Sequence, residues 1–150
     1  MGHTRNVITI NAPYSLVFDI SNDIPRWSSL FGKEYVKAEV LEKKGNEITF
    51  RLTDDENKSW VSKRWLYKDL KFAYASRWEP MFPFKYMKII WLYNETPDGV
   101  EMVWIQDFAM DPKAKFNDEK VEGFVNQHST KNMQIFKEVI EKEAGLAAKK

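Results

Sequence analysis

Two segments with a strand-like period of two place polar side chains among large apolar ones on the same face. The two faces consist of Trp60, Ser62, Arg64 and Leu66, and of Met102, Trp104, Gln106 and Phe108. A buried guanidinium or amide without a partner costs from about 1 to several kcal/mol. Arg64 and Gln106 therefore require either internal partners or a polar ligand, which makes both of them candidate binding groups.

A second polar interruption occurs in the long helical segment near the end of the chain. Its apolar stripe includes His128, Ser129 and Asn132, whereas a helix that only filled a core would carry leucine or alanine there. The two strand faces and this stripe are the places where the sequence departs from simple core patterning.

Each of these residues also has a purely structural interpretation. Arg64 could pair with Glu39 or Glu79 on neighbouring strands, Gln106 could be a satisfied core amide, and His128 could be a hydrogen-bonded core histidine. The aromatic side chains fill a core by default, and lining a cavity is a special case of that role. The aromatic candidates for such a lining are Trp27, Phe31, Trp60, Trp91 and Trp104.

The composition excludes several classes of function. The net charge is +1 with both signs interleaved along the chain, which argues against nucleic acid as a partner because phosphate binding needs a concentrated basic face. The absence of cysteine excludes disulfides, a thiol nucleophile and thiolate metal sites, and two histidines argue against a histidine-based metal centre. No metal or cofactor is predicted.

The same sequence predicts a cytoplasmic protein that has no membrane partner. The first residues lack the apolar core of a signal peptide. No apolar run approaches the roughly 20 residues that span a bilayer.

The elements that must position these side chains follow from periodicity and turn signals. Strands are predicted at Thr4–Ile10, from Tyr35 to about Leu41, around Ile48–Leu52, and at Ser59–Tyr67, Phe72–Glu79, Lys85–Asn94 and Val100–Met110. Asn11 is a candidate cap for a short helix, and a second short helix is predicted from Asn22 or Asp23. A long helix is predicted from Asn117, with Val121, Phe124, Val125, His128, Asn132, Ile135, Phe136, Val139 and Ile140 facing inward.

This order predicts an α+β protein in which a curved antiparallel sheet of about seven strands wraps around the C-terminal helix and encloses an internal cavity. The two short helices after the first strand would plug one end of the cavity. A single domain is expected over residues 1–143, and a frayed tail over 144–150.

Short segments spread over most of the chain resemble the tetracenomycin aromatase/cyclase family of polyketide cyclases, which has the helix-grip fold of the START superfamily. The resembling region runs from about Asn6 to Glu141. The segments are Asn11-Ala12-Pro13, Asn22-Asp23-Ile24, Trp27, Leu30-Phe31, Glu34-Tyr35, Trp60-Val61-Ser62-Lys63-Arg64, Pro83-Phe84-Lys85-Tyr86-Met87, Glu101-Met102-Val103-Trp104-Ile105-Gln106-Asp107-Phe108 and Asn132-Met133.

The resemblance implies an aromatase/cyclase that folds a poly-β-ketone and directs its aldol cyclisation and dehydration without a cofactor. It implies that Arg64 stabilises carbonyl charge and that Tyr35 transfers protons. The implied substrate-binding residues are Trp27, Phe31, Trp60, Ser62, Trp91, Trp104, Gln106, His128, Ser129 and Asn132.

The resemblance also implies partners: an acyl carrier protein bearing the poly-β-ketone, and the other components of a minimal polyketide synthase. The chain itself is expected to be a monomer or weak dimer. Candidate docking residues at the cavity mouth are Lys33, Lys37, Lys85 and Lys88. Two alternatives remain: a non-catalytic carrier or sensor of an apolar metabolite, and a co-chaperone or quinone-binding accessory factor that acts through its surface.

Overall fold

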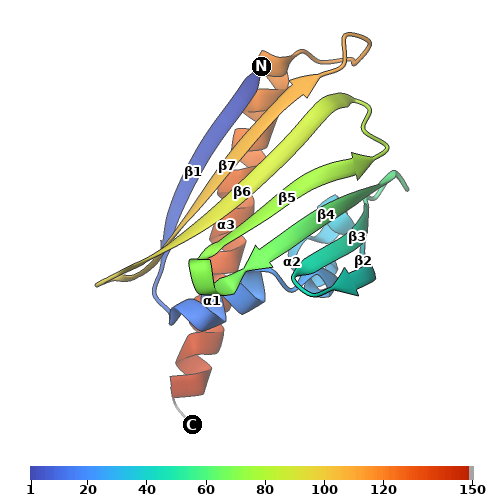
Figure 1. Ribbon diagram of the computed structural model, residues 1–150. Helices are drawn as coiled ribbons and strands as arrows, with labels where there is room; N and C mark the ends of the chain where they lie inside the picture. Colours follow the sequence, from blue (N-terminus) through green and yellow to red (C-terminus); the bar gives the residue numbers. More distant parts are fainter. Residues whose placement is uncertain (149–150) are drawn as a thin grey trace.

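The structure is a computed structural model that describes residues 1–148, in which one curved sheet packs with one long helix and two short ones (Figure 1). The strands are β1 (Gly2–Ile10), β2 (Lys37–Lys44), β3 (Glu47–Thr53), β4 (Ser59–Tyr67), β5 (Phe72–Glu79), β6 (Phe84–Thr96) and β7 (Gly99–Met110). The helices are α1 (Tyr14–Ser21), α2 (Trp27–Phe31) and α3 (Asp118–Ala148), with 3₁₀ turns η1 (Ile24–Arg26), η2 (Gly32–Tyr35) and η3 (Lys68–Leu70).

The sheet is antiparallel throughout, with the strand order β1-β7-β6-β5-β4-β3-β2. Register shifts leave one extra residue in β2 (Leu41), in β5 (Trp78) and in β6 (Lys85); such bulges bend strands and increase their twist. The sheet therefore curves, and α3 crosses its concave side (Figure 1). This confirms the predicted architecture of a curved seven-stranded sheet around a C-terminal helix.

The main core lies between α3, the short helical segments and the concave face of the sheet, and it extends from Ile10 of β1 to Phe50 of β3. Met133, Phe136 and Ile140 of α3 are almost completely buried. The Phe136 ring packs edge-on against Trp91 of β6 and Trp104 of β7, with centroid distances of 6.0 and 5.9 Å. These contacts fix the helix on the sheet, so that the polar residues on its preceding turns face the other part of the concave surface.

The β6–β7 turn needs glycine at one position. Gly99 has a φ of +131°, and a Cβ atom there would lie 2.2 Å from the carbonyl oxygen of Ile10. The predicted Pro97-Asp98-Gly99 turn is confirmed, and the close approach of β1 explains why its last residue has no side chain.

The first helical segments differ from the sequence prediction. Asn11 does not cap α1, whose N-cap is Pro13. The backbone amide of Asn11 instead donates to Glu141 of α3. Of the two predicted starts of the second helical segment, Asp23 is the N-cap of η1, which leads directly into α2. The Asn22 side chain is instead buried and bonded to the Phe18 carbonyl and the Tyr93 hydroxyl. Tertiary contacts therefore override the local capping signal at both asparagines.

The predicted start of the second strand was also wrong. Tyr35 was expected to begin a strand but belongs to the turn η2, and β2 starts only at Lys37. Helix α3 continues to Ala148, and Arg26 binds Glu143 of this helix at 2.8 Å. The frayed tail from Ala144 stays a prediction. Residues 149 and 150 lie outside the described residues.

The start of α3 confirms its predicted cap, since the Asn117 side-chain oxygen accepts from the Lys120 amide at 2.9 Å. The predicted inward stripe is partly wrong, because Phe124 and His128 are exposed. Both residues line a cavity beside α3, and the Phe124 ring packs edge-on against Phe116. No helix within residues 1–148 is long and apolar enough to cross a membrane.

Candidate active site

A cavity of about 510 Å³ lies between the concave face of the sheet, the α2–η2 segment and α3. The structure brings all twelve residues singled out from the sequence to its wall. They are Trp27, Phe31, Tyr35, Trp60, Ser62, Arg64, Trp91, Trp104, Gln106, His128, Ser129 and Asn132.

Arg64 is a buried cation on this wall, with 2% of its surface exposed. Its Nε donates to the Asn22 side-chain oxygen at 2.8 Å, and its Nη2 has no partner within the described residues. Neither Glu39 nor Glu79 pairs with it, so the ion-pair interpretation was wrong; Glu39 lies beside Lys37 and Arg51 instead. Burial lowers the pKa of Arg64 to about 10, so that it is still charged at neutral pH.

Aromatic rings support this charge in place of a carboxylate. The Arg64 guanidinium carbon lies 4.1 Å from the centre of the Trp91 ring and 5.6 Å from that of Trp27. Trp91 in turn stacks on Trp104, with 4.2 Å between centroids and an interplanar angle of 6°. Cation–π attraction of this kind contributes about 2 kcal/mol or more when the cation is desolvated. It fixes the face of the guanidinium against the ring, while the N–H groups at its edge can still donate hydrogen bonds to a ligand.

Gln106 and Ser129 join the sheet to the helix across the cavity wall. The Gln106 amide nitrogen donates to the Ser129 hydroxyl at 2.7 Å, and both residues are buried. The interpretation of Gln106 as a hydrogen-bonded amide therefore holds, and it coexists with a place on the cavity wall.

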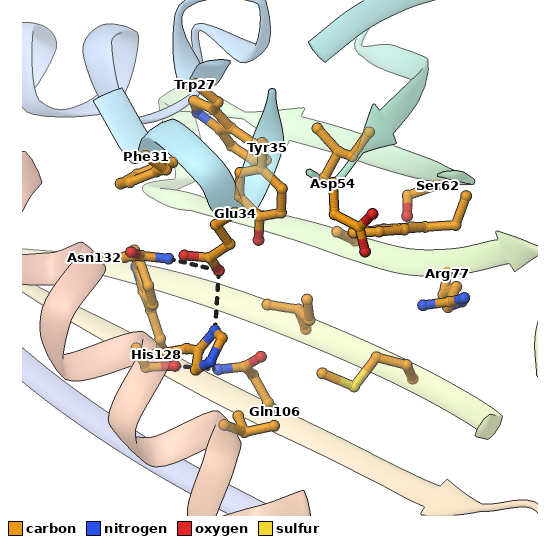
Figure 2. Close-up of a pocket in the computed structure, with 18 of the residues that line it drawn as sticks. Trp27, Phe31, Glu34, Tyr35, Asp54, Ser62, Arg77, Gln106, His128 and Asn132 are labelled. Atoms are coloured by element: carbon orange, nitrogen blue, oxygen red, sulfur yellow. Dashed lines mark hydrogen bonds and ion pairs between the residues drawn. The ribbon is translucent and has the colours of Figure 1, made fainter. Parts of the chain in front are cut away.

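Glu34 was not predicted as a site residue, yet it connects the two sides of the cavity mouth. Its Oε1 lies 3.2 Å from His128 Nδ1 and 3.2 Å from Asn132 Nδ2, both on α3 (Figure 2). Burial raises the pKa of Glu34, but the hydrogen bonds and charge of its partners outweigh burial and leave that pKa lowered. The interaction with Glu34 likewise raises the pKa of His128.

His128 is therefore not a core histidine, because 62% of its side chain is exposed at the cavity mouth. Its ring faces a carboxylate on one side and solvent on the other. The position next to Tyr35 was the available sequence signal for Glu34, but no pattern in the sequence pairs residues that are 94 positions apart.

Tyr35 packs between two tryptophans at the cavity wall. Its ring centroid lies 6.1 Å from that of Trp27 and 6.1 Å from that of Trp60. Burial, and then the negative charge of the adjacent Glu34, raise the pKa of Tyr35 well above its usual range. The phenol is therefore protonated throughout the neutral pH range.

Arg77 of β5 is a second cavity arginine that sequence reasoning missed, although it shares a strand face with Ala73 and Ala75. Its guanidinium lies over the Trp60 and Phe84 rings, at 5.2 and 5.3 Å. It also donates to the carbonyl oxygens of Pro80 and Phe82. Burial lowers the pKa of Arg77 to about 10, and Figure 2 places it on the far side of the cavity from His128.

No group of three or more His, Asp or Glu side chains within residues 1–148 could hold a metal ion. The charged and polar groups of the cavity instead form small hydrogen-bonded sets, Glu34 with His128 and Asn132 and Gln106 with Ser129, between aromatic walls. Such a wall suits a flat organic molecule with several oxygen atoms.

A protein-family model described as "Polyketide cyclase / dehydrase and lipid transport" matches residues 1–141. The chain belongs to this family. It is 46% identical over 145 residues to a Streptomyces cyaneus protein named as a candidate polyketide cyclase, covering 93% of this chain and 94% of that protein.

Two solved structures show the fold that this polyketide cyclase family member adopts. The Zhui aromatase/cyclase from Streptomyces sp. R1128 superposes with a TM-score of 0.77 at 19% identity, over 95% of this chain and 93% of the other. A START-superfamily protein from Mycobacterium smegmatis gives a TM-score of 0.69 at 9% identity, over 98% and 99%. The fold is thus the START-like helix-grip fold, as the sequence predicted.

Proposed function

We propose that the protein is an aromatase/cyclase that binds a poly-β-ketone in its cavity and directs regiospecific aldol cyclisation and dehydration to an aromatic ring, without a cofactor. The proposal rests on the polyketide cyclase family membership and on similarity to a protein whose structure is titled an aromatase/cyclase. The substrate would arrive on an acyl carrier protein from a minimal polyketide synthase.

The observation that carries the proposal is the unsatisfied edge of Arg64. A fully buried guanidinium whose Nη2 lacks a partner among the described residues suits a ligand oxygen that gains negative charge. A poly-β-ketone has carbonyl oxygens at regular intervals. Arg64 would bind one of them, while Gln106, Ser62, Ser129 and Asn132 would hold others.

The chemistry needs little more than a fixed conformation, because a poly-β-ketone enolises readily. The aromatic walls would hold the chain so that one enolate carbon faces one carbonyl carbon. As the new C–C bond forms, Arg64 would stabilise the alkoxide, and Tyr35, as a neutral phenol, would protonate it. Loss of water then gives the double bond that leads to the aromatic ring.

The alternative is a non-catalytic carrier, which the words "lipid transport" in the family description keep open. Reconstitution with a minimal polyketide synthase and malonyl-coenzyme A separates the two functions. A cyclase changes the product distribution in favour of one cyclised aromatic product. A carrier binds the flat probe alizarin, detected by tryptophan quenching, but leaves the ratio of products unchanged; that result would contradict the proposal.

A further inference from the structure

Glu34 is the carboxylate of the cavity whose environment suits chemistry. Only 16% of its side chain is exposed, and it lies between Tyr35 and His128 (Figure 2). Its partners, His128 and Asn132 of α3, fix one of its oxygens at 3.2 Å each. The carboxylate is therefore held at the wall rather than turned into solvent.

The other acidic residues on the described cavity wall are differently engaged. The Oδ1 atom of Asp54 accepts the backbone amides of Glu56 and Lys58, at 3.0 and 2.9 Å, and so closes the β3–β4 turn. Asp55 is exposed. Glu34 is thus distinguished from both by its burial and by its position beside a phenol.

The charge states of the adjacent pair are complementary. The partners of Glu34 keep its pKa low, so that it is an anion at neutral pH, while Tyr35 retains its proton. A proton acceptor and a proton donor consequently lie side by side on one wall, in the protonation states that general base and general acid catalysis require.

We propose that Glu34 is the general base of the cyclisation, that Tyr35 is its paired acid, and that His128 and Asn132 are positioning residues for the carboxylate. This rests on the proposed aromatase/cyclase function. Glu34 removes a proton from a CH₂ group between two ketones, and the electron pair of that C–H bond forms the new C–C bond. The π electrons of the attacked carbonyl move to its oxygen, which takes the proton of Tyr35.

Glu34 and Tyr35 return to their starting protonation states without exchanging a proton with solvent. After the aldol step Glu34 is a carboxylic acid and Tyr35 a phenolate, and the proton passes from the first to the second because the phenol is much the weaker acid. Dehydration repeats the cycle. Glu34 removes a second proton from the same carbon, the C–O bond breaks, and the hydroxyl leaves as water with the proton of Tyr35.

Several groups around Glu34 determine its charge. His128 and Asn132 contact it from α3, Tyr35 adjoins it on η2, and Lys131 opposes protonation of His128. Arg64 of β4 acts on Tyr35. Lys33, Asp54 and Asp55 share the same mouth. Of these groups, His128 makes the charged contact with Glu34, so its removal should raise the pKa of the carboxylate.

The test is Glu34→Gln in the reconstituted system, which keeps an oxygen for His128 and Asn132 but removes the base. The share of cyclised product in total polyketide is measured, since this ratio cancels the activity of the synthase. We expect a fall of about 10²-fold, with the affinity for alizarin changed by less than about threefold. Glu138→Gln, an exposed residue of α3, is the control for loss of one negative charge and should behave as the unmodified protein.

A second measurement separates positioning from structure. The product share should fall at low pH as Glu34 becomes protonated, and in His128→Asn this fall should move to higher pH, because the partner that lowers the Glu34 pKa is gone. An unchanged share of cyclised product in Glu34→Gln would overturn the proposal, and so would a loss of alizarin binding together with the product. The proposal would also be overturned if the pH dependence of the product share in His128→Asn were the same as in the unmodified protein. Failure of the unmodified protein to change the products would instead reject the proposed function itself.

Discussion

Three buried polar atoms of the cavity wall have no partner among residues 1–148 and can bind a ligand. Within the described residues, Arg64 Nη2, Trp104 Nε1 and Asn132 Oδ1 are all buried and lack a hydrogen bond, and all three residues line the cavity. Each such atom costs about 1–3 kcal/mol. Two donors and one acceptor fit a ligand that carries ketone oxygens together with an enol hydroxyl, which is the mixture that a poly-β-ketone presents.

Replacing Arg64 tests this complementarity most directly. Arg64→Ala should lower the share of cyclised product by about 10²-fold, the effect of removing one donor to a developing oxyanion. Arg64→Lys should restore little, because an ammonium lacks the planar face that stacks on Trp91 and the fixed fork of donors. Product shares are compared after circular dichroism has established folding, and full product from a folded Arg64→Ala would assign Arg64 a structural role.

Tyr35→Phe isolates the phenol hydroxyl, because the ring and its contacts with Trp27 and Trp60 are retained. Loss of a catalytic acid should lower the cyclised share by about 10²-fold or more, with unchanged alizarin affinity. Since the pKa of Tyr35 is raised, its ionisation should cause no loss of activity at mildly alkaline pH. A fall of less than about threefold would mean that water protonates the alkoxide and that the protein acts mainly as a template.

At the scale of elements, the sequence predicted the strands better than the segment between β1 and β2. The strands carry period-two patterns bounded by turn residues such as Pro97-Asp98-Gly99, and local sterics are enough to define them. Asn11, Asn22 and Tyr35 were misassigned because each contacts residues far away in the sequence, Asn11 through its backbone amide and the other two through their side chains. Asn22, for example, accepts from Arg64, 42 positions away.

In the candidate site, too, some residues could be predicted from local sequence patterns and others could not. Arg64 and Gln106 could be predicted from strand parity. Each is a polar residue on a strand face that otherwise carries aromatic and apolar residues, and a stretch of nine or ten residues is enough to recognise that pattern. Twelve residues predicted from parity, the helix stripe and the family resemblance do line the cavity. The contact between Glu34 and His128 depends on how η2 faces α3, and local periodicity contains no information about that approach.

The packing of α3 on the sheet can be tested at Phe136. Its side chain is fully buried against Phe31, Trp91 and Trp104. Phe136→Ala should reduce the free energy of unfolding by about 3–5 kcal/mol, since it loses burial and opens a void. Urea denaturation measures this, with Ile135→Ala, a half-buried residue on the same helix, as a milder control. A loss below about 1 kcal/mol would show that the cavity wall collapses around the missing ring.

At the scale of the whole molecule, charge is distributed unevenly around the cavity although the net charge is only +1. Arg64 is buried in the wall, and Arg77 lies on the side away from His128 (Figure 2). The lining also includes Asp54 and the exposed residues Lys33 and Asp55. Of the four lysines suggested as docking residues, only Lys33 belongs to the described cavity lining. Lys37 lies 3.5 Å from Glu39, and Lys88 lies over the Tyr86 ring.

This arrangement makes Lys33 the sharpest test of the carrier protein as partner. Acyl carrier proteins are typically acidic, so reversing a lysine beside the opening should mainly slow association, and the effect should diminish with salt. Lys33→Glu should lower turnover of carrier-bound substrate several-fold at low salt and much less at about 0.5 M salt, with unchanged affinity for free alizarin. Lys142→Glu, the same charge change at an exposed position of α3 outside the cavity lining and outside the candidate docking residues, is the matched control. Equal losses in both variants, or a loss in Lys33→Glu that salt does not reduce, would place the carrier elsewhere on the surface or remove it as a partner.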